Sequence, residues 1–244
     1  MDRPFSLKAL ILMGGRGARF NSPLPKQFHL LGEKRIYLHT LDTFVESGFF
    51  QEIILVCAHD WIEEVEKEVH SYTGVRVVAG GETRQDSSYL GLLACGKETD
   101  RVIIHDAVRP FVSHAILKRN VEACEKHEAV DTCIPSADTL IKTRDGKTID
   151  AIPPRKELMR GQTPQSFSYK LILEAHARAK KSRVSATDDC ALVLAMEKEV
   201  YIVAGEEKNI KITTDFDFAV AERLFQFQPQ SSSEPQGSQS ARLS

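Results

Sequence analysis

The apolar stretch LKALILM (Leu7–Met13) runs directly into GGRGARF (Gly14–Phe20), and PKQ (Pro25–Gln27) follows shortly after. A short apolar run predicts a buried strand, and glycines allow the loop behind it to bring backbone N–H groups close to an anion. The same segment supplies three cations, Arg16, Arg19 and Lys26. We therefore predict that this loop follows the first strand of a sheet and binds a polyphosphate.

Two well-known phosphate-binding loops do not fit this spacing. A dinucleotide-binding fingerprint needs a third glycine where Phe20 stands, and a P-loop needs Gly-Lys followed by Ser or Thr at its end. A solvent-exposed turn rich in glycine and arginine is the remaining alternative. The strand before the loop and the Pro-Lys-Gln after it favour an anion site over that alternative.

The composition restricts the class of protein. A chain of 244 residues suits one domain of ordinary size with a substantial core. Charged residues make up 27% of the chain, but the net charge is -2. No overall basic field therefore attracts nucleic acid or an acidic membrane surface, and any anion site has to be local.

Cysteine usage and hydropathy predict the compartment. The five cysteines are odd in number and widely spaced, without a CxxC pair, which argues against a disulfide framework and against a zinc site. No apolar stretch approaches the ~18 residues of a membrane span, and residues 1–6 lack the apolar core of a signal peptide. We therefore expect a cytoplasmic protein with reduced cysteines and with neither a membrane nor nucleic acid as partner.

Six apolar, β-rich runs are predicted strands: Leu7–Met13, Glu52–Cys57, Val75–Ala79, Arg101–His105, Ala129–Pro135 and Val200–Val203. Segments of helical periodicity, such as 61–70 and 115–126, lie between most of them. This alternation is typical of an α/β fold, and we predict a doubly wound, mostly parallel sheet. In such sheets ligands bind beyond the carboxyl ends of the strands, so the loops behind the strands should carry the chemistry.

The stretch IKTRDGKTIDAI (Ile141–Ile152) alternates apolar and polar residues about an Asp145-Gly146 turn. It predicts an inserted β-hairpin arm over about residues 138–160. A second subunit would cover its edges and apolar face in a two-fold dimer; packing against its own domain is the alternative. The single domain is expected to span residues 1–225, and the Gln/Ser/Pro-rich residues 226–244 to form a disordered tail.

The loop behind the fourth predicted strand reads HDAVRP (His105–Pro110). Asp106 offers hard oxygens to Mg²⁺, and Arg109 suits bidentate capture of a phosphate. A local ion pair that stabilises the turn is the alternative. The position at the end of an apolar strand favours a ligand site.

A second loop, GGETRQDSS (Gly80–Ser88), ends the third predicted strand and starts a helix. Its glycines permit a tight turn, and Asp86 and Ser87 are suited to satisfying the first helical turn. Arg84, Ser87 and the nearby backbone amides are equally able to hydrogen-bond the edge of a nucleobase. Both interpretations stay open at this point.

Two later segments carry polar groups of the same kind. TDD (Thr187–Asp189) precedes an apolar helix and suits an N-terminal cap, which competes with a ligand role. In NIKIT (Asn209–Thr213), Lys211 alternates with isoleucines in a predicted strand before a helix that starts at Asp215. Its side chain is expected to end either in solvent or over the ligand.

Together, these segments resemble the 2-C-methyl-D-erythritol 4-phosphate cytidylyltransferases from about Leu7 to Phe225. Six motifs occur in the order and spacing of that family: GGRGARF with PKQ, GGETRQDS, HDAVRP, QTPQ (Gln162–Gln165), TDD and NIKIT. The resemblance implies a Rossmann-like fold with a β-arm that makes a homodimer. It also implies conversion of CTP and 2-C-methyl-D-erythritol 4-phosphate to 4-diphosphocytidyl-2-C-methyl-D-erythritol and pyrophosphate, in non-mevalonate isoprenoid biosynthesis.

The resemblance further implies roles for individual residues. The CTP-binding set is Gly14, Gly15, Arg16, Gly17, Arg19, Lys26, Gly81, Arg84, Ser87 and Asp106. The triphosphate would be held by Gly15, Arg19 and Lys26, and the cytosine would meet Gly81, Arg84 and Ser87. The set near the polyol phosphate is Asp106, Arg109, Thr139, Arg155, Thr163, Thr187 and Lys211. Thr139 and Arg155 would reach in from the partner's arm.

The implied reaction is in-line attack of a phosphate oxygen of the polyol phosphate on the α-phosphorus of CTP, without a covalent enzyme intermediate. Because both reactants are anions, the enzyme has to overcome their repulsion and to stabilise the charge that builds on the α-phosphate and pyrophosphate. Arg19, Lys26 and Lys211 are the expected catalytic residues. Mg²⁺ on the triphosphate is the expected cofactor, with Asp106 as its direct or water-mediated ligand.

The sequence departs from the family pattern in three places. Met13-Gly14 stands where the family usually has two alanines, Phe20 where it often has methionine, and Pro154-Arg155 where it commonly has Asp-Arg. The last change concerns the arm arginine and therefore the polyol; a related subgroup that uses ribitol 5-phosphate shares the same framework. A non-catalytic nucleotide-binding module and a nucleotidyltransferase for another sugar phosphate are further alternatives, and the module gives no reason for a second set of cations.

Overall fold

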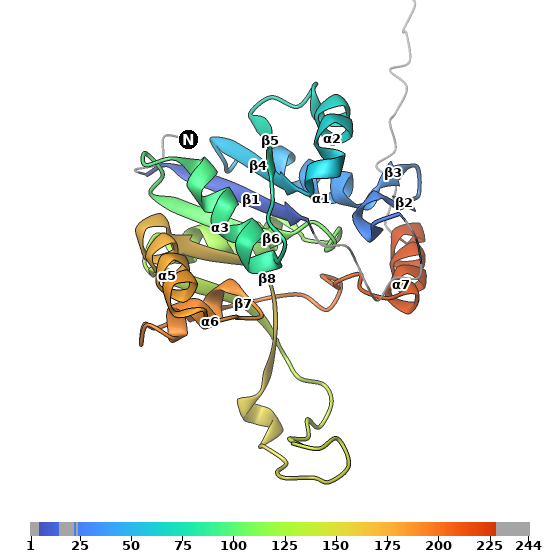
Figure 1. Ribbon diagram of the computed structural model, residues 1–244. Helices are drawn as coiled ribbons and strands as arrows, with labels where there is room; N and C mark the ends of the chain where they lie inside the picture. The colour runs from blue at the N-terminus through green and yellow to red at the C-terminus, as the bar shows by residue number, and fades with distance from the viewer. Residues whose placement is uncertain (1–4, 15–21, 23, 228–244) are drawn as a thin grey trace, which may run out of the picture.

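The computed structural model describes residues 5–14, 22 and 24–227, which form a seven-stranded sheet with helices on both faces (Figure 1). The strand order is β5-β4-β1-β6-β8-β7-β9. Neighbouring strands run parallel except for β8, which is antiparallel to both β6 and β7. The strands are β1 (Leu7–Met13), β4 (Glu52–Cys57), β5 (Val75–Ala79), β6 (Arg101–Asp106), β7 (Ala129–Pro135), β8 (Met159–Ser168) and β9 (Tyr201–Ala204). The predicted α/β, doubly wound and mostly parallel sheet is confirmed.

The limits of β1, β4, β5 and β7 are those predicted, and β6 and β9 differ from the prediction by one residue at their ends. The sequence did not predict β8, because its segment MRGQTPQSFS is mostly polar and contains a proline. The register of β8 against β7 shifts between Val130 and Thr132, opposite the segment that holds Pro164. Proline has no N–H for the ladder, so a strand tolerates it at such an irregularity.

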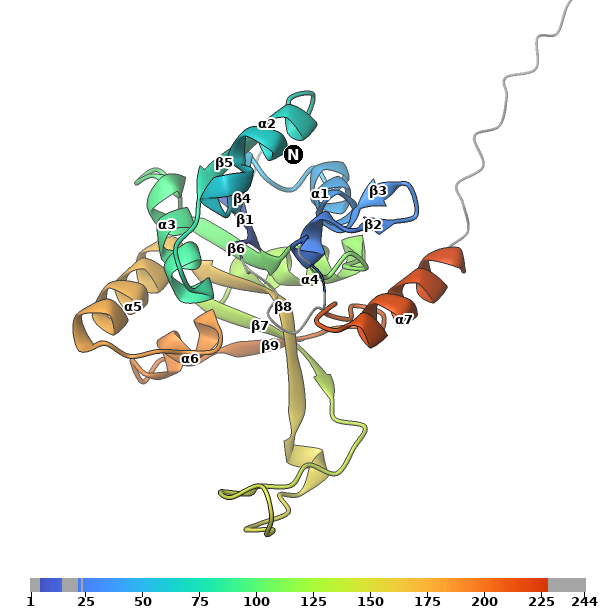
Figure 2. The ribbon, with the colours of Figure 1, turned by 45° about the vertical axis from the view of Figure 1, so that its right-hand side comes forward.

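The helices form one layer on each face of the sheet (Figures 1 and 2). One layer contains α1 (Ile36–Glu46), α2 (Ile62–Val69) and α4 (His114–Cys124); the other contains α3 (Arg84–Cys95), α5 (Tyr169–Ser182) and α6 (Asp189–Leu194). In the described part of the chain, no helix is long and apolar enough to cross a bilayer.

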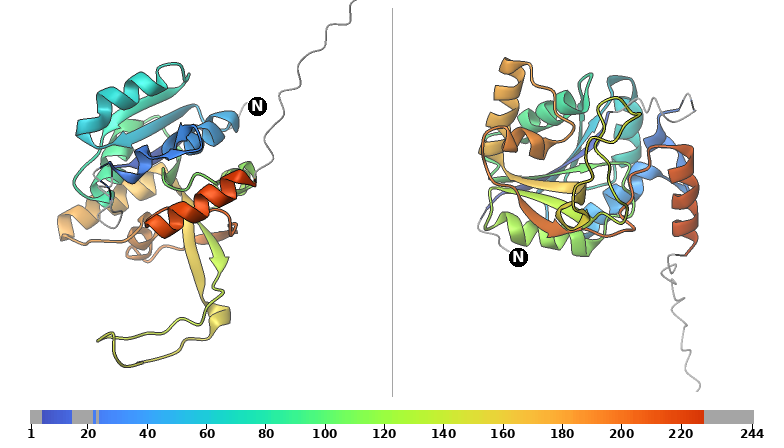
Figure 3. Two further views of the ribbon diagram at one scale, coloured as in Figure 1. Left: turned by 90° about the vertical axis from the view of Figure 1, so that its right-hand side faces the viewer. Right: turned by 90° about the horizontal axis from the view of Figure 1, so that it is seen from below.

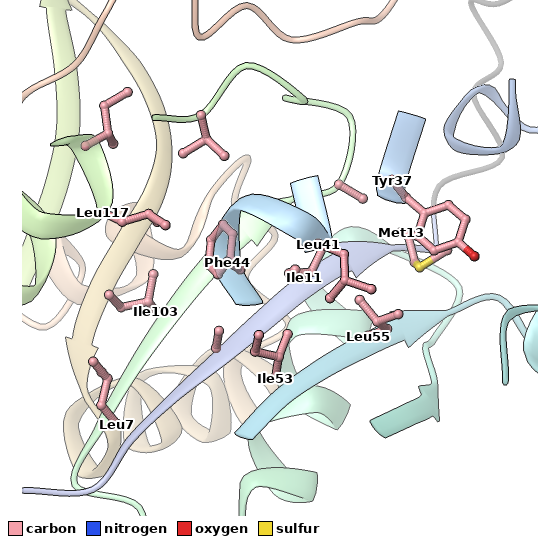
Figure 4. Packing of buried hydrophobic residues seen from close by; sticks show 14 of the residues in the cluster. Leu7, Ile11, Met13, Tyr37, Leu41, Phe44, Ile53, Leu55, Ile103 and Leu117 are labelled. Carbon is pink, nitrogen blue, oxygen red and sulfur yellow. The ribbon is translucent and has the colours of Figure 1, made fainter. Parts of the chain in front are cut away.

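Buried side chains on both faces explain why β1 is apolar at every position except Lys8. Leu7, Ile11 and Met13 pack on the side of α1, as Figure 4 shows, whereas Leu10 and Leu12 pack on the side of α3 and α5. A strand covered by helices on both faces has no solvent side, so it needs no polar alternation. The carboxyl end of β1 is thereby fixed beside the carboxyl end of β6.

The segment between β7 and β8 projects from the body as an arm (Figures 1 and 2). The predicted turn is present: Gly146 has a φ of +69°, and Asp145 Oδ1 accepts bonds from the backbone N–H groups of Lys147 and Thr148, both at 2.8 Å. The predicted hairpin is short: among the described arm residues outside the named strands, its two sides pair at one antiparallel bridge, between Lys142 and Ala151. The arm also contains the short helix η3 (Arg155–Glu157).

The last helix, α7 (Asp215–Gln226), lies outside these layers, beside the small hairpin of β2 (Leu30–Leu31) and β3 (Lys34–Arg35), as Figure 3 shows. The aromatic ring of Phe225 fills the space beside Gly32, where a Cβ would lie 2.4 Å from a ring carbon. The helix η1 (Lys26–Phe28) precedes this hairpin, and Lys211 precedes α7. Packing of α7 on the hairpin therefore brings the segments of both lysines to one side of the molecule.

Candidate active site

A cavity of about 160 Å³ lies at the carboxyl ends of β1 and β6. Its lining residues are Leu12, Met13, Gly14, Lys26, Gln27, Arg84, Ser87, Asp106, Val108 and Lys211. Larger hollows of about 640 and 860 Å³ lie at the opposite ends of the strands, around Tyr201 and around Arg101. We take the smaller cavity as the candidate site, because ligands of such sheets bind at the carboxyl ends of strands and because its lining brings Lys26, Arg84 and Lys211 together with one carboxylate, Asp106.

Asp106, the last residue of β6, is the centre of this charge cluster. Its Oδ1 accepts a bond from Arg84 Nε at 3.1 Å, and its Oδ2 accepts one from Lys211 Nζ at 2.7 Å. Its backbone N–H donates to Thr163 Oγ1 at 3.1 Å. Burial alone would raise the pKa of Asp106, but Arg84, Lys211 and Arg109 outweigh burial and hold that pKa well below its usual range.

Arg84 is the first residue of α3 and bridges two carboxylates. In addition to its bond to Asp106, its Nη1 donates to Asp189 Oδ2 at 2.8 Å. The two carboxylates raise the pKa of Arg84 against the opposing effect of burial, so the guanidinium stays charged. The bridge joins the start of α3 to the start of α6 across the cavity floor.

The loop before α3 is fixed by its own polar side chains. Thr83 and Asp86 form a capping box, which confirms the predicted role of Asp86 in the first helical turn. The hydroxyl of Ser87 accepts a bond from the backbone N–H of Gly81 at 3.1 Å and donates to the carbonyl of Thr83 at 2.9 Å. A Cβ on Gly81 would lie 2.4 Å from the Cβ of Asp86, so this turn requires glycine. Ser87 thus shapes the loop and also lines the cavity.

Lys26 enters the cavity from the helix η1. The side-chain amide of the next residue, Gln27, donates to the carbonyl of Met13 at 2.6 Å and ties η1 to the end of β1. Phe28 is buried and stacks on Trp61 with ring centroids 4.2 Å apart. The predicted phosphate ligands Gly15, Arg16, Gly17 and Arg19 lie outside the described residues, and Gly14 and Lys26 lie on either side of them in the sequence.

The segment that carries Lys211 is not a strand, contrary to the prediction. A backbone bond ties this segment to the loop after β6: the N–H of Ile212 donates to the carbonyl of Val108 at 2.9 Å. Asn209 is fully buried, and its Nδ2 donates to the carbonyl of Thr163 at 2.9 Å. These contacts place Lys211 in the lining of the cavity.

Other predicted site residues lie around or away from this cavity. Arg109 is buried behind it and donates through Nη1 to the carbonyl of Asn209 at 2.8 Å. Thr163 supports Asp106 from β8, as described above. Thr187 is exposed before α6, and Thr139 and Arg155 are exposed on the arm, where Arg155 Nη1 contacts the carbonyl of Ala137 at 3.3 Å. The cavity of this single chain therefore excludes the arm residues.

Several residues that the sequence analysis did not assign also organise the site. Gln27 belongs to the PKQ motif and Asn209 to the NIKIT motif, but the sequence analysis assigned neither residue a role. His105 is fully buried, and its Nδ1 lies 3.0 Å from Thr163 Oγ1. Burial lowers the pKa of His105 to about 3, so its ring is neutral near pH 7. His176, which contacts Asp189, had no signal in the sequence beyond its place on a helix.

The described residues of the cavity can supply few ligands to a metal ion. Among the described residues, no three His, Cys, Asp or Glu side chains are grouped so as to hold a metal ion. Among the described residues that line the cavity, Asp106 is the one carboxylate, and both of its oxygens contact cations. This donor set fits Mg²⁺ of the kind that takes most ligands from substrate phosphates and water.

The chain is similar to proteins of known activity. The family model IspD, 2-C-methyl-D-erythritol 4-phosphate cytidylyltransferase, matches residues 7–226. The ribitol-5-phosphate cytidylyltransferase of Lactiplantibacillus plantarum is 38% identical over 226 residues, which are 88% of this chain and 97% of that protein.

Solved structures of similar sequence share the fold. The 4-diphosphocytidyl-2C-methyl-D-erythritol synthase of Anaerococcus prevotii aligns with a TM-score of 0.81 and 32% identity over 91% of this chain and 99% of that one. The 2-C-methyl-D-erythritol 4-phosphate cytidylyltransferase of Thermus thermophilus aligns with a TM-score of 0.73 and 30% identity over 89% and 98%.

Proposed function

The chain belongs to the 2-C-methyl-D-erythritol 4-phosphate cytidylyltransferase family, and from this premise we propose that it makes 4-diphosphocytidyl-2-C-methyl-D-erythritol and pyrophosphate from CTP and 2-C-methyl-D-erythritol 4-phosphate. That it is a cytidylyltransferase follows from the family. The polyol, the metal and the dimer are the parts that we propose, along with a place in non-mevalonate isoprenoid biosynthesis.

The observation that carries the proposal is the cluster of Lys26, Arg84 and Lys211 around Asp106 at the carboxyl ends of β1 and β6. A phosphate oxygen of the polyol phosphate attacks the α-phosphorus of CTP, and the bond from that phosphorus to the bridging oxygen of pyrophosphate breaks. The nucleophile is already an anion, so no strong base is needed. The cations offset the repulsion between two polyanions and the charge that builds on the leaving pyrophosphate.

Lys211 and Arg84 would differ in their freedom to meet the substrates. Within the described part of the chain, Lys211 has one ion-pair partner, Asp106, and its side chain is 36% exposed. Arg84 is held by Asp106 and Asp189. Lys211 is therefore the cation that turns toward the reacting phosphates, whereas Arg84 stays on the floor of the cavity. Mg²⁺, when bound with CTP, would neutralise triphosphate oxygens, and Asp106 would be its protein ligand.

We propose that the arm completes the site of a second subunit in a homodimer. Apolar side chains on the arm, Leu140, Ile141, Ile149 and Ile152, are 43–60% exposed in the single chain. Burying them against a second copy would remove apolar surface from water. Thr139 and Arg155 lie on the same arm and are absent from the cavity lining of their own chain, which supports a role in the partner's site.

Ribitol 5-phosphate is the second candidate substrate, because a ribitol-5-phosphate cytidylyltransferase is 38% identical to this chain. The Pro154-Arg155 departure lies in the arm and therefore concerns the choice between the two polyols. The two polyols differ in chain length, hydroxyl count and a methyl branch, and a site built to bond a matched hydroxyl discriminates strongly.

A pyrophosphate-release assay with CTP, UTP, ATP and GTP against each polyol phosphate, with Mg²⁺, tests the proposal. We expect CTP to be the preferred nucleotide. We also expect kcat/KM to favour 2-C-methyl-D-erythritol 4-phosphate over ribitol 5-phosphate by about 10²-fold or more. A higher value for ribitol 5-phosphate would assign the chain to the second candidate, and no turnover with either would contradict both.

A further inference from the structure

A buried polar cluster lies next to the active-site cavity, outside its lining. Asp189, the first residue of α6, is 1% exposed. Its Oδ1 accepts bonds from Ser88 Oγ at 2.7 Å and from His176 Nε2 at 2.8 Å, and its Oδ2 accepts the bond from Arg84 Nη1 at 2.8 Å. Ser88 and His176 are also buried, on α3 and α5. The reaction as proposed uses none of these three groups.

The need to cap α6 does not explain this cluster. The side chain of Asp188 already caps the helix by accepting a bond from the backbone N–H of Ala191 at 2.9 Å. A second, fully buried carboxylate beside it is costly unless it is paired and hydrogen-bonded. Burial raises the pKa of Asp189, but Arg84 and His176 overcome that effect and lower the pKa to about 2. Asp189 is therefore ionised and accepts hydrogen bonds from Arg84, His176 and Ser88.

The two oxygens of Asp189 accept bonds from different donors: Oδ1 from Ser88 and His176, and Oδ2 from Arg84. Because the carboxylate is ionised and only accepts, His176 donates from Nε2, and Ser88 donates to the same oxygen. The imidazole is further fixed by stacking on Tyr89, with ring centroids 5.9 Å apart. Two donors on Oδ1 set the rotation of the carboxylate and leave Oδ2 directed at Arg84.

The orientation of the Arg84 guanidinium depends on these bonds to Asp189. Nε bonds Asp106 and Nη1 bonds Asp189, while Nη2 is buried without a hydrogen-bond partner among the described residues. The two carboxylates are therefore the groups that fix its plane. Without a correctly rotated Asp189, Arg84 keeps a single bond to Asp106 and can turn about it.

We propose that His176 and Ser88 are positioning residues for Arg84, and that they act through Asp189 to hold the guanidinium in place for the nucleotide. The inference rests on the proposed function in taking Arg84 as a contact of CTP. It assigns no direct contact with substrate to His176 or Ser88. Through these residues, α5, which packs against α3, is connected to the part of the cavity that Arg84 lines.

Direct measurement of CTP binding by calorimetry tests this proposal, because it does not depend on which polyol is the substrate. His176→Leu removes the donor at similar size, and we expect it to weaken CTP binding by about 10-fold. His176→Gln places an amide N–H near the position of Nε2, and we expect binding within about 3-fold of the wild type. Ser88→Ala, a smaller change, should weaken binding by about 3-fold and serves if His176→Leu does not fold.

A double-mutant cycle separates positioning from a general structural role. In the Arg84→Ala background, adding His176→Leu or Ser88→Ala should change CTP affinity by less than about 2-fold, because the residue they position is gone. Equal effects in the two backgrounds would overturn the proposal, as would a His176→Leu variant that only melts at lower temperature and binds CTP normally. A wild-type chain that binds no CTP would contradict the proposed function itself.

Discussion

Lys211 Nζ lies 2.7 Å from Asp106 Oδ2, although α4, β7, the arm, β8, α5, α6 and β9 separate the two residues in the chain. The same carboxylate also bonds Arg84. One buried anion therefore holds two cations at the carboxyl ends of the central strands. This arrangement makes Asp106 both a structural and a functional group.

Replacement of Asp106 should reveal how much this carboxylate contributes to the stability of the fold. In Asp106→Asn the cations Arg84, Arg109 and Lys211 lose their shared counter-charge, so we expect the free energy of unfolding to fall by about 2 kcal/mol or more. Urea denaturation at pH 7 measures it. Asp60→Asn, which changes an exposed carboxylate of the helix η2 (His59–Trp61), is the control. A loss no larger than that of Asp60→Asn would mean that the cluster contributes little to stability.

Lys26 should act in the transition state. It lines the cavity from η1 and is expected to offset charge on the triphosphate as the bond to pyrophosphate breaks. Lys26→Ala should lower kcat by about 10²-fold while the far-ultraviolet circular dichroism spectrum stays unchanged. Lys126→Ala, at the opposite end of the strands, should leave kcat unchanged. Near-normal kcat in Lys26→Ala would remove this lysine from the mechanism.

Mixed dimers test the proposed role of the arm. If Arg155 serves the partner's site, a heterodimer of one Lys26→Ala chain and one Arg155→Ala chain contains one site with both residues intact. Two inactive homodimers should then regain activity after they are mixed and allowed to exchange subunits. Native mass spectrometry verifies that heterodimers form. Verified heterodimers without activity would place Arg155 in its own chain's site or outside the reaction.

His105 should make stability depend on pH. Burial lowers its pKa to about 3, whereas an unfolded histidine titrates near about 6.5, so below about pH 6.5 the unfolded chain binds a proton that the folded chain excludes. Stability is lost as the pH falls through this window toward 3. Between pH 7 and 5 the contribution amounts to about 2 kcal/mol.

His105→Asn, which keeps a polar group near Thr163, isolates this contribution from the other histidines. Urea denaturation at pH 7 and at pH 5 should show a smaller loss of unfolding free energy for the variant than for the wild type. The wild-type loss should exceed the variant loss by about 2 kcal/mol. Equal losses in the two proteins would show that His105 does not exclude the proton.

The sequence by itself was sufficient for the sheet wherever a strand is apolar on both faces. The segments Leu7–Met13 and Glu52–Cys57 were predicted to the residue, because burial between two helix layers favours a nearly continuous apolar run, and such a run is visible locally. The turn at Gly146 and the cap at Asp86 are equally local, since both depend on bonds within a few residues. The family motifs identified the chemistry for the same reason: each is contiguous.

Only the tertiary structure decided the strand β8, the placement of Lys211 and the partners of Arg84. β8 is polar, and its place in the sheet depends on pairing with β6 and β7. Arg84 meets Asp106 and Asp189 because the sheet order brings the starts of α3 and α6 to the end of β6. Such ion pairs join groups far apart in the chain, and a side chain's charge gives no information about its distant partner. Their geometry is fixed by packing of the sheet and its helices, which no local pattern encodes.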